Sequence, residues 1–248
     1  MRVEFKFNAD DKIVLPIHHN HIIQGFIYNS FSDESFASFL HDFGYKWNKR
    51  NFKLFAFSRL MGRFTIDREN KNIVFEPPVK LVITSIKDRI IQDLTANVIK
   101  KNWLQLGKQR VFVEELEFKT FKKNTNTLTI NMLSPVVTYH TEKINGSKKT
   151  RYYTPWEEEF KQQIKNNLIK KYEIIKGKDS GDAAKDFDIK PLFKKGKPSI
   201  VIYRGFVIKG WMGKFRLAGD PELLQIGYNC GIGAKNSMGH GCFEILIS

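Results

Sequence analysis

The sequence is poor in cysteine and in long apolar runs, and each shortage excludes a class of protein. Two cysteines in 248 residues cannot form a disulfide framework, so we expect a reducing, cytoplasmic setting. No apolar run approaches the roughly 18 residues of a membrane-spanning helix. The N-terminus, MRVEFKFNADDK, also lacks the apolar core of a signal peptide. The sequence therefore predicts neither a transmembrane nor a secretory segment.

Acidic residues are scarce as well, and this leaves a large positive charge. The chain holds 41 Lys and Arg against 26 Asp and Glu, a formal net charge of +15. Such a balance favours a polyanionic partner, nucleic acid first and an anionic membrane second. The 42% of hydrophobic residues excludes a disordered basic tail. The 21 Phe and 8 Tyr suit stacking on unpaired bases, although they serve an ordinary core equally well.

Acidic clusters with metal-ligand spacing are missing. Asp10-Asp11 is typical of a turn, and Glu157–Glu159 of a helix N-terminus. Three histidines fall within residues 18–21, but no Cys or carboxylate stands at companion spacing. We therefore expect no metal site and no cofactor.

The first half of the chain alternates strand-like and helix-like segments. Strands are predicted at residues 1–8, 52–61, 63–75 and 111–121. Helices are predicted at residues 18–30, 32–43 and 87–101. Ser32 is predicted as the N-cap of the second helix, and Gly44 as its end. Its predicted core face consists of Phe36, Phe39, Leu40 and Phe43.

The second half repeats this alternation. Strands are predicted at residues 127–132, 199–206 and 242–247, and helices at residues 155–172 and 223–228. Thr154 and Glu157 have capping-box spacing, and Pro155 is predicted as the first helical residue. The lysine-rich stretch 173–199 is predicted to be a basic loop or an irregular hairpin.

The first half therefore reads as β-α-β-β-α-β, which is the ferredoxin-like order, and the second half reads roughly the same way with one strand fewer. We predict an α+β protein of two tandem ferredoxin-like domains, over residues 1–122 and 123–248. The polar, turn-prone residues 122–126 mark the boundary.

Three side chains in the first domain could carry chemistry. On a helical wheel of about 100° per residue, His41 lies about 140° from Phe36, off the predicted core face. Tyr28 also falls opposite the apolar face of its helix, and Lys53 follows shortly after. A His can donate or accept a proton near neutral pH, and a Lys can neutralise a crowded phosphate. This set suits RNA cleavage by a 2′-hydroxyl, although a lone surface His often has no function.

A glycine-rich segment near the C-terminus is the second candidate site. Its glycines Gly231, Gly233, Gly239 and Gly241 bracket Lys235, Asn236 and Ser237. The spacing matches neither a Rossmann fingerprint nor a Walker loop. Bare backbone N–H groups could approach phosphates here, with donors from the three polar side chains. The alternative is an ordinary glycine-rich turn.

The segment Gly231–Phe243 resembles the C-terminal signature of the CRISPR-associated repeat endoribonucleases, the Cas-six family. Further blocks resemble that family in the expected order, at residues 21–28, 39–44, 52–58, 131–135 and 153–172. The resemblance implies two ferredoxin-like, RRM-like domains and metal-independent cleavage of CRISPR repeat RNA (pre-crRNA). The products would carry a 5′-hydroxyl and a 2′,3′-cyclic phosphate.

The resemblance also implies roles for residues and partners. His41 would be the general acid or base, with Tyr28 and Lys53 as its companions, and the glycine-rich loop would contact RNA. Cas proteins of an interference complex would be further partners, a homodimer is compatible, and a membrane is not implied. The alternative is a non-catalytic module that only binds repeat RNA within a CRISPR effector complex.

Overall fold

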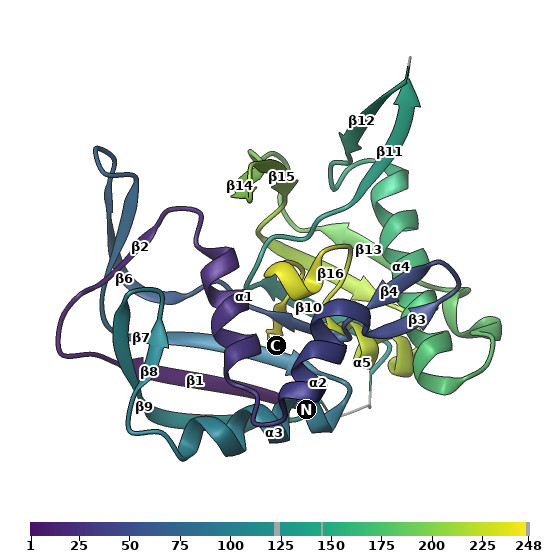
Figure 1. Cartoon of the computed structure of the whole chain (residues 1–248). Helices are drawn as coiled ribbons and strands as arrows, with labels where there is room; N and C mark the ends of the chain where they lie inside the picture. The colour runs from purple at the N-terminus through teal and green to yellow at the C-terminus, as the bar shows by residue number, and fades with distance from the viewer. Residues whose placement is uncertain (122–124, 145, 247–248) are drawn as a thin grey trace.

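The N-terminal domain is built on an antiparallel sheet. In the computed structural model, which describes residues 1–121, 125–144 and 146–246, strand β1 (Arg2–Asn8) lies between β7 (Asn72–Ser85) and β9 (Gln109–Lys119) (Figure 1). β5 (Phe55–Phe57) pairs with the other edge of β7, which completes the ferredoxin-like order β9-β1-β7-β5. Additional strands extend this sheet: β2 (Ile13–Pro16), β6 (Met61–Asp67) and β8 (Leu104–Leu106).

Helices cover one face of this sheet. The main ones are α1 (Asn20–Asn29) and α3 (Asp88–Ile99). A short third helix, α2 (Glu34–Ser38), follows α1. Val3, Phe5 and Phe7 of β1 point into the core that these helices cover, as their alternation predicts. The strand pair predicted over residues 52–61 and 63–75 is wrong in its pairing, because β6 and β7 form the hairpin and β5 pairs separately with β7.

The C-terminal domain repeats the order on a four-stranded sheet, β13-β16-β10-β17. Its elements are β10 (Thr127–Met132), α4 (Glu158–Lys176), β13 (Asp188–Pro191), β16 (Lys214–Ala218), α5 (Pro221–Cys230) and β17 (Phe243–Ile245). Two hairpins extend beyond this sheet (Figure 1). They are β11 (Tyr139–Ile144) with β12 (Ser147–Tyr152), and β14 (Ser199–Tyr203) with β15 (Phe206–Gly210). The structure is thus the predicted α+β protein with two sheets in ferredoxin-like order.

Three predictions in this half are corrected. The strand predicted at residues 199–206 is not part of the domain sheet, because β14 pairs only with β15 in a separate hairpin. The stretch 173–199 is not simply a basic loop, because β13 within it is a strand of the sheet and buries Ile189, and Phe187 directly before it is buried too. Helix α4 begins at Glu158, and Pro155 lies before it; Glu157 is the N-cap, and its carboxylate accepts from the Thr154 N–H at 2.5 Å.

The predicted boundary at residues 122–123 lies outside the described residues, as does Ile247 at the end of the last predicted strand. Two separate hydrophobic clusters lie on either side of that boundary, over residues 3–111 and 128–243. We propose that the domains divide there.

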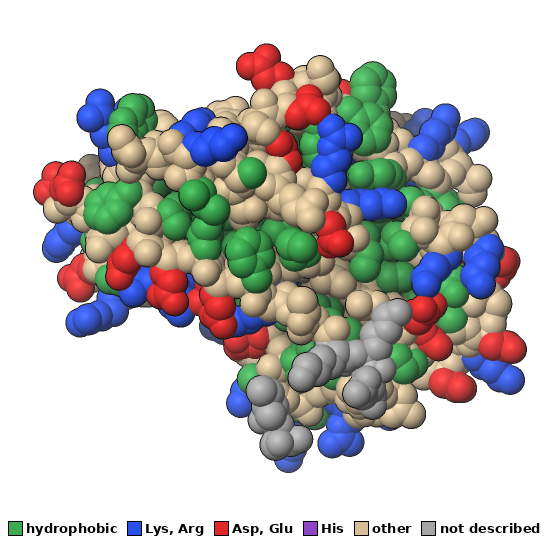
Figure 2. All heavy atoms as spheres, turned by 90° about the horizontal axis from the view of Figure 1, so that it is seen from below, with side chains coloured by type: hydrophobic (Ala, Val, Ile, Leu, Met, Phe, Trp, Pro, Cys, Tyr) green, Lys and Arg blue, Asp and Glu red, His purple; other side chains and the backbone are tan. Residues whose placement is uncertain are grey.

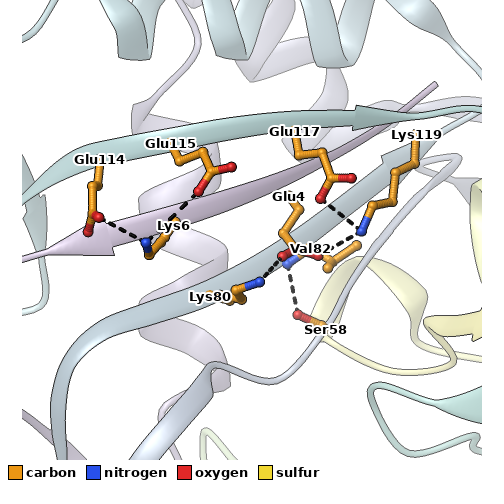
Figure 3. Close-up of polar contacts among 9 residues, drawn as sticks. All are labelled: Glu4, Lys6, Ser58, Lys80, Val82, Glu114, Glu115, Glu117 and Lys119. Carbon is orange, nitrogen blue, oxygen red and sulfur yellow. Dashed lines mark hydrogen bonds and ion pairs between the residues drawn. The ribbon is translucent and has the colours of Figure 1, made fainter.

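The sheet face of the first domain opposite α1 and α3 is covered in part by the C-terminal domain, and beyond that contact it carries ion pairs (Figure 3). Glu4 of β1 accepts from Lys80 at 2.6 Å and from Lys119 at 3.4 Å. Lys6, two residues on, pairs with Glu114 of β9 at 2.8 Å. Burial raises the pKa of Glu4, but the two lysines outweigh it and hold that pKa below its usual value. Seen from below, acidic and basic side chains are likewise interspersed on the surface (Figure 2).

Buried polar contacts join the two domains. The buried Arg2 side chain of β1 donates to the Phe243 carbonyl at 2.7 Å, and its guanidinium lies 4.7 Å from the Tyr228 ring centroid. The Thr84 hydroxyl of β7 donates to the Tyr228 carbonyl at 3.1 Å. These contacts fix the C-terminal sheet against the strands of the first domain.

A second buried cation, Lys171 of α4, holds the glycine-rich loop. Its Nζ donates to the carbonyls of Cys230 and Gly231, at 3.3 and 2.7 Å, and to Asn236 Oδ1 at 2.7 Å. Three acceptors match the three donors of an ammonium group. Burial lowers the pKa of Lys171 to about 8, so the group is still mainly charged at neutral pH.

We predict that Lys171→Met lowers the free energy of unfolding by about 3 kcal/mol, because it leaves buried acceptors without a donor. Urea denaturation measures this change. The matched control is Lys170→Met, which removes the same charge from a half-buried neighbour and should change stability by less than about 0.5 kcal/mol. Equal stability of the two variants would contradict the anchoring role of Lys171.

His240 makes the stability of the fold sensitive to acid. Its side chain is fully buried, and burial, aided by the charges of Lys235 and Arg59, lowers its pKa to about 3. The folded protein therefore keeps this ring neutral, whereas the unfolded chain protonates it below about pH 6.5. Stability is complete above that pH and falls as the pH falls.

At pH 5 this linkage should cost about 2 kcal/mol relative to pH 7. We predict that His240→Leu removes this loss of about 2 kcal/mol. The buried His19, whose pKa is also lowered by burial, leaves a remaining dependence of stability on pH. His21→Gln, at an exposed position, is the control and should keep the wild-type dependence. If His240→Leu loses as much stability between pH 7 and pH 5 as the wild type does, another group is responsible for the loss.

Candidate active site

His41 lies on a π-helix, η1 (Phe39–Phe43), and not on the continuous α-helix that the apolar spacing predicts. The α-helical part begins at Glu34, and its N-cap is Asp33, whose carboxylate accepts from the Phe36 N–H at 3.0 Å. The predicted N-cap, Ser32, instead donates its hydroxyl to Asp93. Wider π turns rotate the following side chains, and such turns are frequent at functional sites.

This change of register alters which side chains are buried. Phe36 and Leu40 enter the core as predicted, but Phe39 is 38% exposed and Phe43 is 66% exposed. The prediction that all four form one core face is therefore wrong for the last turn. His41 is exposed, as predicted.

Gly44 ends the π-helix and brings Lys53 back to it. Its φ of +67° is the left-handed conformation that glycine adopts readily, and a Cβ there would lie 2.6 Å from the Phe52 carbonyl oxygen. The hairpin of β3 (Tyr45–Trp47) and β4 (Arg50–Phe52) follows immediately. After this short reversal, Lys53 Nζ donates to the His41 carbonyl at 2.6 Å.

Tyr28 of α1 completes the cluster. Its ring meets that of His41 edge-on, with the centroids 5.0 Å apart. The helical wheel is partly wrong here, because Tyr28 is half-buried against Phe31 and Phe55 and does not point away from the core. Burial raises the pKa of Tyr28, so the phenol keeps its proton and can donate a hydrogen bond. The fold thus brings together the three residues singled out in the sequence.

Asp42 is a fourth member that sequence reasoning missed, although its place beside His41 was visible. His41 Nδ1 lies 2.7 Å from Asp42 Oδ1. If Nδ1 carries the proton of the neutral ring, Nε2 is left as the proton acceptor. Burial lowers the pKa of Lys53, and the charge of Asp42 opposes this shift.

A cleft of about 660 Å³ lies beside this cluster, between the two domains. Its lining draws on the segment 50–55, on residues 137–141, on α4 and on the glycine-rich loop. The cationic side chains in the lining are Arg50, Lys53, Lys170, Lys171 and Lys235. None of the described lining residues is acidic. Such a cleft attracts a polyanion.

Lys53 connects this cleft to the cluster, since it both lines the cleft and contacts His41. Sequence reasoning missed Arg50, Lys170 and the aromatic Tyr139, over whose ring the Lys235 ammonium lies at 5.1 Å. No local signal marks them, because they lie far apart in the sequence.

Several polar groups of the glycine-rich loop already form hydrogen bonds within the protein. All four glycines have positive φ, and a Cβ at Gly241 would lie 2.0 Å from the Ile232 carbonyl oxygen. The N–H groups of Gly239 and Gly241 already donate to backbone carbonyls. Asn236 donates to the Ile232 and His240 carbonyls, and accepts from Lys171.

The expectation that the loop offers phosphate donors is therefore wrong for Gly239, Gly241 and the Asn236 side chain. Gly231 acts through its carbonyl, which accepts from Lys171. Gly233, Lys235 and Ser237 remain in the lining of the cleft.

The same loop docks on the helix that carries Tyr28. Asn20 of α1 donates to the Met238 carbonyl at 2.9 Å, and Gln24 donates to the Ser237 carbonyl at 2.7 Å. The loop and the cluster are therefore positioned by one helix.

The described part of the chain has neither a cluster of metal ligands nor a helix that could span a membrane. No three His, Cys, Asp or Glu side chains in the described part of the chain converge where they could hold a metal ion. His19, from the histidine-rich segment, is buried, with Nδ1 3.0 Å from the Pro16 carbonyl oxygen. Nor does any described helix combine the length and apolarity that crossing a membrane requires.

Known proteins share this architecture over the whole chain. A CRISPR-associated endoribonuclease, Cas6 1, of Methanocaldococcus jannaschii is 28% identical over 97% of this chain and 91% of its own length. A solved Cas6-related protein from Pyrococcus furiosus superimposes with a TM-score of 0.84 at 23% identity, covering 99% of this chain and 98% of its own. A solved RAMP protein described as binding different RNA substrates has a TM-score of 0.82 at 23% identity, with both chains fully covered.

Family comparison agrees with the two-domain fold. Residues 14–117 match the N-terminal description of the CRISPR-associated protein Cas6, and residues 114–245 match its C-terminal description. With both parts matched in order over most of its length, the chain belongs to the Cas6 family of CRISPR-associated proteins.

Proposed function

We propose that this protein is a metal-independent endoribonuclease that cleaves CRISPR repeat RNA into guide units. The observation that carries the proposal is the meeting of Tyr28, His41 and Lys53 beside a cleft whose charged lining is entirely cationic. The curated relative from Methanocaldococcus jannaschii, named as a CRISPR-associated endoribonuclease, supports the same activity.

The reaction needs a proton acceptor, a proton donor and a positive charge. The RNA 2′-oxygen attacks the adjacent phosphorus while its proton passes to a base, for which His41 Nε2 is suited by the Asp42 contact at Nδ1. The bond from phosphorus to the 5′-oxygen breaks, and that oxygen takes a proton from an acid. The products are a 2′,3′-cyclic phosphate and a 5′-hydroxyl, and no water is consumed.

Lys53 and Tyr28 stabilise the charge that develops. The Lys53 ammonium, already in the cleft, would lie against the anionic phosphorane oxygens. The protonated Tyr28 phenol can donate to the phosphate or hold the His41 ring in place. The remaining cations of the cleft bind the RNA backbone without reading its sequence.

Cleavage should continue at an unchanged rate when EDTA removes divalent metals, because His41 and Lys53 supply the proton transfer and the charge. The substrate is a synthetic RNA carrying the repeat of the CRISPR array nearest the gene. Product ends are checked by mass spectrometry, which distinguishes a cyclic phosphate from a linear one. If EDTA abolishes cleavage and Mg²⁺ restores it, the metal-free mechanism is refuted.

His41→Ala should lower the single-turnover cleavage rate by about 100- to 10,000-fold, the usual contribution of a general acid or base. Lys53→Met should lower it by about 100-fold, and Lys53→Arg should recover part of that loss because it keeps the charge. Affinity for an uncleavable repeat, with its 2′-hydroxyl removed at the scissile position, should change far less in all three.

Lys46→Met is the matched control, since it removes the same charge from the exposed face of the neighbouring hairpin. Its cleavage rate should equal that of the wild type. If His41→Ala also cleaves at the wild-type rate, His41 is not part of the machinery. If the wild type binds the repeat but yields no product, the chain is a non-catalytic repeat-binding module.

A further inference from the structure

A second groove lies on the N-terminal domain, on the side of α1 turned away from the glycine-rich loop. Its volume is about 650 Å³, and it is lined by α1 residues 22–30 and by the segment 101–107. On α1, Gln24 contacts the loop, whereas Gly25 and Asn29 line this groove. The helix thus separates the groove from the cleft described above.

Trp103 gives the groove an exposed aromatic surface. Trp103 lies in the segment that connects α3 to β8, and its side chain is 50% exposed. The guanidinium of Arg110 lies 4.7 Å from its ring centroid. Ile99, 64% exposed, and Phe112, 38% exposed, belong to the flanking segments. Figure 2 shows hydrophobic side chains gathered on the face that carries α3.

The charge around this aromatic is of one sign. Residues 94–113 contain Lys100, Lys101, Lys108 and Arg110, and no acidic residue. The acidic residues of β9 begin at Glu114, and Lys6 pairs with that carboxylate (Figure 3). The segment around the groove is therefore cationic, while the acidic half of the same strand is neutralised by its neighbours.

Polar side chains complete the groove. Asn29, Asn102 and Gln105 line it, and their amides carry both donors and acceptors. Amide groups beside an exposed aromatic ring suit the edge and the face of a base, and the lysines suit its phosphates.

We propose that this groove binds an unpaired nucleotide of the RNA, whose base stacks on Trp103 and whose phosphates contact Arg110 and the neighbouring lysines. This rests on the proposed function in that the ligand is RNA, but it adds a contact remote from the scissile bond. A neutral peptide would use the apolar surface alone, and an acidic peptide the cations, whereas a nucleotide uses the aromatic face, the amides and the four cations together.

The test measures binding of an RNA that cannot be cleaved. The probe is a fluorescein-labelled, single-stranded 2′-O-methyl oligoadenylate of about twelve nucleotides, followed by anisotropy at one salt concentration. Trp103→Ala should weaken binding by about 5- to 150-fold, the range measured for one stacked base. Trp103→Phe keeps an aromatic face and should recover most of the affinity.

Gly25 lines the groove from α1, so a larger side chain at this position can fill the groove while Trp103 is left unchanged. A Cβ at this position would have no other atom within 4 Å, so Gly25→Leu can project into the groove without a clash. It should weaken binding as Trp103→Ala does, while Gly25→Ala should not. Phe118→Ala is the matched control for an exposed aromatic, because Phe118 is 52% exposed near the end of β9 and does not line the groove.

Wild-type affinity in both Trp103→Ala and Gly25→Leu would overturn the proposal and leave the surface to a protein partner. If Trp103→Ala fails to fold by circular dichroism, Gly25→Leu against Gly25→Ala decides alone. Because the probe has no free 2′-hydroxyl, this result does not depend on catalysis. Absence of repeat cleavage by the wild type would refute the proposed function and leave the groove measurement intact.

Discussion

The buried ammonium of Lys171 is the contact on which the functional half of the molecule depends. It joins α4 to the end of α5 and to Asn236 in one step. A buried charge is expensive unless all its hydrogen bonds are made, and here the three acceptors supply them. The loop held in this way then packs on α1, through Asn20 and Gln24. A single cation of the second domain thereby holds the loop that contacts the helix carrying Tyr28.

The candidate active site illustrates how little regular structure a reactive geometry needs. One π turn, one left-handed glycine and one short hairpin bring His41 and Lys53 together within a dozen residues. This geometry also needs the surrounding core, which fixes the Tyr28 ring through its contacts with Phe31 and Phe55. The proposed catalytic side chains His41 and Lys53 can then stay accessible while the residues that support them are buried.

Much of this was predictable, and the failures have physical causes. In the first half the β-α-β-β-α-β order follows from local periodicity, which each segment carries by itself. In the second half the strand predicted at 199–206 lies in a separate hairpin, and the sheet strands β13 and β16 were not predicted. The π turn was missed because the spacing of Phe36, Phe39, Leu40 and Phe43 also fits an α-helix, and Gly44 and the hairpin packed behind it decide the register. Asn236 was misread as a ligand because its partner, Lys171, lies 65 residues away. Likewise β13 is hidden in a lysine-rich stretch, since only two buried side chains mark it.

The ion pairs on the open sheet of the first domain have a consequence for how an RRM-like fold is used. In RNA-binding domains of this shape, aromatic side chains on the sheet surface commonly stack on bases. Here β1 presents Glu4 and Lys6 on that surface, each already satisfied by charges from β7 or β9. RNA would have to displace these pairs to lie flat on the strands. If the protein binds RNA as proposed, the paired charges leave this sheet surface out of the contact, and the RNA contacts lie at its margins, where helices and connecting segments can diverge without disturbing the strands.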